Sequence, residues 1–297
     1  MKDEILAYLK SDFERRFFLA SIANLERHDD PLRFNSFAYS LRELVRNIFA
    51  LRAPDEKVMA CSWFKPETDN GLPTRQQRYI YCVQGGLSPD FVKNQLKFDT
   101  LAPWKGIKDS IDKLSKYTHV TESTFDICNE MCEEYAEDAL ESVLNIFYMA
   151  SDAKAELIDH LQKEIDSELI GTCISNTMPD IDILSHSSYV EQTEVHESRI
   201  VSVDEREIVF EGNGTAYVSL NYGKGEDSCE INDDYPFTFT GRSSVLEPRK
   251  LQIPPENISI DVSSWFGDEP EDFDEVGMDE TDSGVVVNHS ELEAKGF

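Results

Sequence analysis

The sequence has few basic residues and no long apolar run. It contains 28 Lys and Arg against 58 Asp and Glu, which gives a formal net charge of −30. No stretch of about 18 consecutive apolar residues occurs, so no transmembrane helix is expected. The N-terminus, Met1-Lys2-Asp3-Glu4, lacks the apolar segment of a secretory signal. The six cysteines lack the paired spacing of a zinc site and indicate reduced thiols. Together these absences predict a cytoplasmic protein that does not bind membranes.

The basic residues that are present are concentrated near the N-terminus. Residues 1–120 contain 19 Lys and Arg and 16 Asp and Glu, a net charge of +3. Residues 121–297 contain the other 9 basic and 42 acidic residues, a net charge of −33. A uniformly acidic protein would be repelled by nucleic acid. The asymmetry leaves the first part of the chain able to bind phosphate, although an acidic surface that only keeps the protein soluble is the simpler alternative.

The hydrophobic pattern divides the chain into three parts and predicts an α+β fold. Up to residue 178, apolar residues recur at helical spacing, with helices expected at 5–25, 31–51, 107–117, 121–149 and 153–169. Residues 179–266 alternate apolar and polar residues between glycine-containing turns, which predicts a small antiparallel β-sandwich or barrel. The helical domain is therefore 1–178 and the β-domain 179–266. Residues 267–297 are acidic and poor in apolar side chains, as in a disordered tail.

The acidic tail is expected to be dispensable for folding. It has few apolar side chains to bury, so ordering it would cost conformational entropy with little compensation. Truncation after Phe266 should leave the midpoint of thermal unfolding nearly unchanged relative to the full chain. A large drop would show that the tail docks on the folded body, for example as a cover over the basic N-terminal part.

Two pairs of side chains could bind a metal. Cys128 and Cys132 lie four residues apart on a predicted helix, but both fall in its apolar stripe, which favours core cysteines. Asp180 and Asp182 could bind Mg²⁺ through oxygen, but the further carboxylate and lysine of a nuclease site are not in place. The glycine-rich turns lack the context of a P-loop or a Rossmann motif. We therefore expect neither a metal nor a cofactor.

His119, in the segment DSIDKLSKYTHVTESTF (109–125), is the candidate for proton transfer. A histidine titrates near neutral pH and can move protons to and from a ribose hydroxyl or a leaving oxygen. The alternative is that His119 only ends its helix, where a positive charge is favoured. The sequence leaves both interpretations open.

Metal-free RNA cleavage also needs a cation that stabilises the charged transition state. Arg42 and Arg46 lie four residues apart on one predicted helix, so their side chains project side by side. If that helix packs beside the segment 107–119, the catalytic group would comprise His119, Lys113, Arg42 and Arg46. The residues expected to bind nucleic acid are Lys116, Arg75, Arg78 and Lys108.

The helical part, with its arginine-bearing helix and the segment LSKYTHV at a helix junction, resembles the HEPN superfamily. That resemblance implies a helical bundle of bacterial defence and toxin systems. Many members are metal-independent RNases that act as dimers and carry an R-x4-6-H motif. Counted back from His119, the arginine would stand at position 112, 113 or 114, and Lys113 is the basic residue there. Lysine keeps the charge but lacks the two-pronged phosphate contact of arginine.

Several short segments, in their order along the chain, are similar to a bacterial family described as predicted nucleases associated with prokaryotic PIWI/Argonaute proteins. This resemblance covers most of residues 35–265 and implies a role in defence against phage or plasmids. The segments are SLRELVRNIF, CSWF, TRQQRYIYCVQGGL, DSIDKLSKYTHVTESTF, DDYPFTFTGR and ISIDVSSWF.

The sequence thus predicts a bacterial anti-phage or anti-plasmid component that acts on nucleic acid, as a metal-independent RNase. RNA is expected in preference to DNA, and the protein partner would be a second copy in a homodimer or another defence protein. The alternative is a non-catalytic HEPN-like scaffold or regulator that binds a partner effector. Lys113 favours the scaffold, whereas the confined basic residues favour the enzyme. A DNA mimic, suggested by the acidic tail alone, is a third interpretation.

Overall fold

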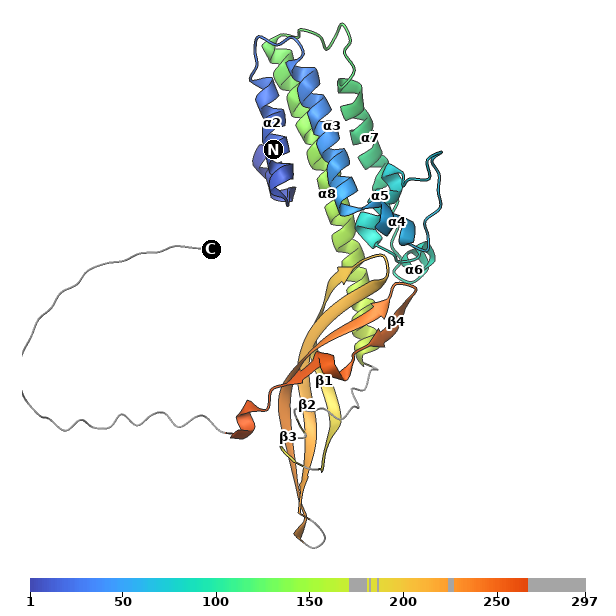
Figure 1. Cartoon of the computed structure of the whole chain (residues 1–297), viewed down its shortest axis with the longest axis vertical. Helices are drawn as coiled ribbons and strands as arrows, with labels where there is room; N and C mark the ends of the chain where they lie inside the picture. The colour runs from blue at the N-terminus through green and yellow to red at the C-terminus, as the bar shows by residue number, and fades with distance from the viewer. Residues whose placement is uncertain (171–180, 182, 186, 224–226, 267–297) are drawn as a thin grey trace, which may run out of the picture. The chain divides into compact units, whose positions relative to one another are not determined.

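The computed structural model describes residues 1–170, 181, 183–185, 187–223 and 227–266. The acidic segment 267–297 and the pair Asp180 and Asp182 lie outside the described residues. Residues 1–262 form one compact unit, and the described part of the second unit is a short 3-10 helix, η3 (Ser263–Phe266). The predicted α+β class is confirmed, because helices fill the first part of the chain and an antiparallel sheet follows (Figure 1).

The described residues form eight α-helices before the first strand. They are α1 (Lys2–Tyr8), α2 (Asp12–Leu25), α3 (Arg33–Arg52), α4 (Asp55–Ala60), α5 (Arg75–Gln84), α6 (Pro89–Asn94), α7 (Trp104–Tyr117) and α8 (Asn129–Ile170). Among the described residues, no helix combines the length and apolarity needed to cross a membrane.

Helix α3 carries the core of the helical part. It packs against α2, α7 and α8, and the four helices lie side by side in Figure 1. The apolar stripe expected from the sequence is confirmed, because each of its members is buried: Phe34, Phe37, Leu41, Leu44, Val45 and Ile48. This packing brings one flank of α3 against α7, as the proposed grouping of Arg42 and Arg46 with the segment 107–119 requires.

The expected single helix over 5–25 is wrong, because the chain breaks after α1. Ser11 caps α2: its hydroxyl accepts from the Glu14 N–H at 3.1 Å, and the Glu14 carboxylate accepts from the Ser11 N–H at 3.2 Å. This reciprocal capping box stabilises a helix start at Asp12. The apolar spacing continues across the break and conceals it.

The helix expected from Thr121 begins later, at Asn129. The Thr124 hydroxyl accepts from the Thr121 N–H at 2.9 Å and donates to the His119 carbonyl at 3.1 Å, which holds a turn instead of a first helical turn. Cys128 is therefore exposed, whereas Cys132 is buried in α8, so the expectation of two core cysteines holds only for Cys132. Helix α8 then continues to Ile170 without the break expected at 151–152.

The described strands form one open antiparallel sheet in the order β1-β2-β3-β4, with β5 paired to β3. The expected sandwich or barrel is corrected, because long consecutive strands build a single sheet and its two ends do not pair. The elements are β1 (Ser187–Val203), β2 (Glu207–Tyr222), β3 (Cys229–Ser244), β4 (Glu247–Gln252), the 3-10 helix η2 (Pro255–Asn257) and β5 (Ile258–Ile260). Alternate residues of β2 and β3, including Phe210 and Phe237, form a buried face.

The turn between β1 and β2 contacts the end of α5. The Gly86 N–H donates to the Asp204 carbonyl at 2.7 Å, and the Tyr81 hydroxyl donates to the Glu205 carboxylate at 3.0 Å. Lys57 forms an ion pair with Glu205 at 3.3 Å. These contacts tie the sheet to the helices within the compact unit.

Candidate functional site

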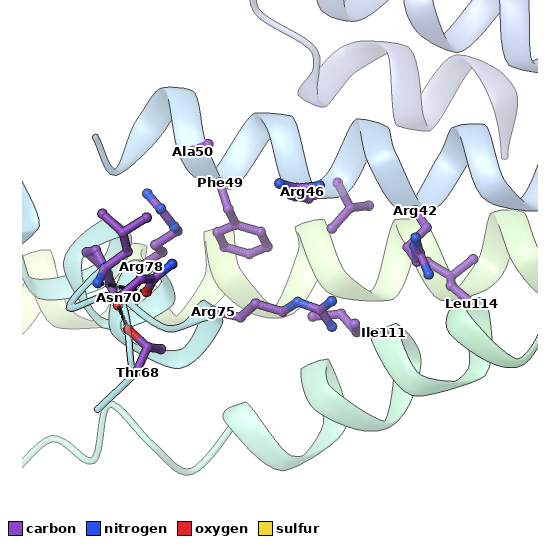
Figure 2. A pocket seen from close by; sticks show the side chains of 13 residues that line it. Arg42, Arg46, Phe49, Ala50, Thr68, Asn70, Arg75, Arg78, Ile111 and Leu114 are labelled. Carbon is purple, nitrogen blue, oxygen red and sulfur yellow. Dashed lines mark hydrogen bonds between the residues drawn. The ribbon is translucent and has the colours of Figure 1, made fainter. Parts of the chain in front are cut away.

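A cavity of about 290 Å³, lined by α3, α5, α7 and the loop 68–73, brings four arginines together (Figure 2). Arg42 and Arg46 come from one flank of α3, and Arg75 and Arg78 come from the first turn of α5. We call this site the arginine cavity. The remaining lining is mostly apolar: Val45, Phe49, Ala50, Thr68, Asn70, Leu72, Pro73, Ile111 and Leu114.

The position of Arg75 follows from the cap of α5. The Thr74 hydroxyl accepts from the Gln77 N–H at 3.2 Å, and the Gln77 amide oxygen accepts from the Thr74 N–H at 2.9 Å. The same Gln77 side chain donates to the Lys65 carbonyl at 2.7 Å, which anchors the loop that precedes α5. A capped helix start therefore fixes Arg75 as the first helical residue at the rim of the cavity.

Glu43 holds the two α3 arginines. The Glu43 carboxylate accepts from Arg42 and from Arg46, each at 3.2 Å. Arg42 also donates to the Thr118 hydroxyl at 3.3 Å, and its guanidinium carbon lies 5.5 Å from the centre of the Tyr39 ring. Arg42 is thus fixed on several sides, whereas Arg46 keeps 71% of its side chain exposed.

The two α5 arginines differ in their availability to a ligand. Arg78 forms an ion pair with Asp55 and donates to the Ala53 carbonyl at 2.6 Å, so it is engaged by the protein itself. Arg75 is exposed, and its side chain makes no hydrogen bond or ion pair within the described part of the chain. Its side chain extends from α5 between α3 and α7 in Figure 2. Glu43 and Asp55 compensate part of the cationic charge, and Arg75 remains available to an anion.

His119 lies just beyond the end of α7, with its side chain exposed. Its backbone is fixed, because the N–H donates to the Lys116 carbonyl at 3.4 Å and the carbonyl accepts from Thr124. The imidazole has no hydrogen bond to another described residue, and it does not line the arginine cavity. Arg42, however, contacts Thr118, the residue directly before His119.

The lysines of α7, like the arginines of the cavity, include one that is paired with an acidic residue and others that are not. Lys113 pairs with Asp138 of α8 at 3.1 Å, and the Tyr117 hydroxyl donates to the same carboxylate at 3.0 Å. These two hydrogen bonds lower the pKa of Asp138, whereas burial and the Asp138 carboxylate raise the pKa of Tyr117 to about 12. Lys108 and Lys116 are exposed and form no ion pair in the part of the chain that the structure describes.

The sequence interpretation missed the residues that hold the arginines. Glu43, Thr118 and the loop 68–73 were not singled out, although an acidic residue between two arginines on one helix signals an ion-paired group. Among the residues described here, no group of three or more His, Cys, Asp or Glu side chains is placed to hold a metal ion.

The family comparison covers both parts of the chain. Two family models, each described as a predicted pPIWI-associating nuclease, match residues 6–143 and residues 150–266. No curated protein and no solved structure matches the chain. The first of the two matched segments contains the whole arginine cavity and His119.

Proposed function

Because the chain belongs to the family of predicted pPIWI-associating nucleases, we propose that it is a bacterial defence component that cleaves RNA. The arginine cavity holds a backbone phosphate, and His119 transfers the proton. In this proposal the helical domain, 1–178, acts on the nucleic acid, and the β-domain, 179–266, serves a second copy of the chain or a partner protein. The observation that supports the proposal is that four arginines line one cavity, the side chain of one of them, Arg75, without a partner among the described residues.

The chemistry of the cavity suits a phosphodiester. Guanidinium groups bind phosphate oxygens through two parallel, charge-assisted hydrogen bonds. The Arg75 side chain is free to turn toward such a ligand, and Arg46 is exposed although it pairs with Glu43, whereas Arg42 and Arg78 are held by several contacts. The apolar surface of Phe49 and neighbouring residues offers a place for a sugar or base beside the phosphate.

The reaction that these groups support needs a ribose 2′-hydroxyl. Its oxygen attacks the adjacent phosphorus while the bond from phosphorus to the 5′-oxygen breaks. His119 accepts the hydroxyl proton and, as imidazolium, donates it to the leaving 5′-oxygen. Arg42 and Arg46 stabilise the charge that develops on the phosphate oxygens. DNA lacks the attacking hydroxyl, which is why the proposal favours RNA.

A non-catalytic scaffold or regulator is the second candidate, and two observations favour it. Lys113, in the position of the expected arginine, is held by Asp138 rather than free for a phosphate. The His119 imidazole has no orienting hydrogen bond among the described residues. In this alternative the arginine cavity binds nucleic acid, or an anionic partner protein, without cleaving it.

Arg75→Ala should weaken the binding of single-stranded RNA by about tenfold, because one charge-assisted phosphate contact is lost. The slope of log affinity against log salt should become shallower by about 0.7, the value for one phosphate contact on a single strand. Fluorescence anisotropy of a labelled oligonucleotide at several salt concentrations measures both quantities.

Arg16→Ala is the matched control, because Arg16 is an exposed arginine of α2, 80% of its side chain accessible, outside the cavity. Its removal changes net charge equally and should leave affinity and slope near those of the parent protein. Equal losses in the two variants would mean that the cavity contributes no specific phosphate contact.

A further inference from the structure

A second cavity, of about 480 Å³, lies between α1, α3 and α8, and the proposed function does not use it. Its lining combines cationic and aromatic side chains, among them Tyr8, Lys10, Phe49, Arg52, Phe147 and Lys154. Phe49 of α3 also lines the arginine cavity, and it is the one residue that the two linings have in common. We call this site the second cavity.

Arg52 lines the second cavity, and 31% of its side chain is exposed. One terminal nitrogen donates to the Tyr8 carbonyl at 2.8 Å and lies 3.9 Å from the Glu14 carboxylate. The Nε atom is buried and has no hydrogen-bond partner among the described residues. The Glu14 carboxylate, which also accepts from the N–H groups of Lys10 and Ser11, thus compensates part of the Arg52 charge from outside the cavity lining.

Two lysines add uncompensated charge to the same space. Neither Lys10 nor Lys154 forms an ion pair within the described residues. Burial lowers the pKa of Lys154, and the nearby cations Lys10 and Arg52 lower it further, against the opposing influence of Cys82. Three cations therefore face one cavity, an arrangement that an anionic ligand would relieve.

The other charged residues of the second cavity are engaged elsewhere. Lys57 pairs with Glu205 at 3.3 Å. The Asp204 carboxylate accepts from the N–H groups of Arg206 and Glu207 at 2.8 and 2.9 Å. Asp204 keeps its charge, but within the described residues it forms no ion pair with Lys10, Arg52 or Lys154.

The aromatic side chains indicate what accompanies the anion. The Tyr8 and Phe147 rings lie with their centres 5.8 Å apart and their planes tilted by 36°. Tyr8 is partly exposed, so it can present its ring to a planar group. Nucleobases stack on such rings irrespective of their sequence. The volume falls within the range of about 300–1,000 Å³ that is usual for small-molecule sites.

We propose that the second cavity binds one nucleotide unit, with its phosphate on Lys10, Arg52 and Lys154 and its base against Tyr8 and Phe147. The unit is either a free nucleotide or the terminal nucleotide of an RNA strand that continues past Phe49 into the arginine cavity. Both sources present the same chemistry to the protein. The site does not depend on RNA cleavage at His119.

Titration calorimetry with AMP on the full chain tests the proposal. AMP should bind the parent protein, and Lys154→Met should weaken that binding by about tenfold, because one charge-assisted contact is lost while the aliphatic stem is kept. Lys163→Met is the matched control on the same helix: Lys163 is 69% exposed, pairs with Asp159 and lies outside the cavity. It should bind AMP like the parent protein. Inorganic phosphate should bind more weakly than AMP, since it lacks the base.

A 5′-phosphorylated oligonucleotide distinguishes the two sources. If the bound unit is the end of an RNA strand, Lys154→Met weakens the binding of the oligonucleotide as well as that of AMP. If it is a free nucleotide, only the binding of AMP is weakened. Lys154 is an exposed residue whose charge is disfavoured where it lies, so the variant should fold with an equal or higher thermal midpoint. Failure of AMP to bind the parent protein, or equal AMP affinity in the folded Lys154→Met variant, would overturn the proposal. Lys154 lies outside the arginine cavity and His119→Ala leaves it untouched, so AMP binding that depends on Lys154 is separate from a failure of the RNase proposal.

Discussion

His119→Ala is expected to lower RNA cleavage by about 10²- to 10⁴-fold, the usual contribution of a general acid–base group. The free energy of unfolding should fall by only about 0.3–1 kcal/mol, the contribution of a cation at a helix C-terminus. The small structural effect follows from the exposed position of His119 and from its fixed backbone, which does not need the imidazole. Cleavage of a labelled RNA and thermal unfolding, measured on the same preparation, separate the two quantities.

Two further measurements, with EDTA and with a Lys113→Arg variant, test the metal-free mechanism and the role of Lys113. EDTA should leave cleavage unchanged; loss of activity with EDTA would reject the metal-free reaction and return attention to Asp180 and Asp182. Lys113→Arg should raise cleavage if a weakened phosphate contact limits the reaction, although the new side chain must first leave Asp138. Protection against phage that survives in a folded His119→Ala variant would remove the nuclease assignment from this site and favour the scaffold.

The sequence predicted correctly the elements whose hydrophobic pattern is continuous. The stripe from Phe34 to Ile48 is buried as expected, because an uninterrupted helical period over several turns leaves little ambiguity. The errors occur where short polar hydrogen bonds override that period. The capping box of Ser11 splits one expected helix, and the Thr124 hydroxyl holds a turn where another was expected to begin. Such local hydrogen bonds depend on single side chains, whereas the hydrophobic period is a property of the whole segment and does not reveal them.

Only part of the site expected from the sequence coincides with the arginine cavity, because His119, Lys108, Lys113 and Lys116 lie outside its lining. Arg42, Arg46, Arg75 and Arg78 were each singled out from the sequence, and all of them line one cavity. Their division into held and available side chains depends on partners from other elements, such as Thr118 and Asp55. The second cavity shows the same limit, because Lys10 and Lys154 are far apart in the sequence and become neighbours only through the packing of α1, α3 and α8.

The form of the sheet also depended on tertiary pairing. Alternating residues predicted antiparallel strands, and these are present, but the alternation does not determine whether a sheet closes on itself. Strands β1 to β3 are 17, 16 and 16 residues long and pair consecutively, which extends one sheet. Whether residues 1–178 and 179–266 fold as separate domains stays a prediction, and the contact at Gly86 gives a direct way to test it.

Gly86→Ala is expected to destabilise the protein by about 1–3 kcal/mol, the usual cost of overpacking. A Cβ at this position would lie 2.4 Å from the carbonyl oxygen of Glu205 and 2.7 Å from its carbonyl carbon. Both atoms belong to the backbone of the turn between β1 and β2, so no flexible side chain can move aside. The Gly86 N–H also donates to the Asp204 carbonyl, and any shift that relieves the clash weakens this bond.

Gly106→Ala is the control for this substitution. Its added Cβ would meet only the end of the Met149 side chain, at 2.9 Å, which can change rotamer. Gly106 lies inside α7, where alanine is favoured over glycine by about 1 kcal/mol, so this variant should be neutral or slightly more stable.

Thermal unfolding compares the two variants, since each kcal/mol of stability corresponds to a shift of roughly 2–4 °C in a chain of this size. If Gly86→Ala were as stable as Gly106→Ala, the turn between β1 and β2 would not be held closely against the end of α5. A single cooperative transition that moves to lower temperature in Gly86→Ala would instead show that the two parts stabilise one another through this contact.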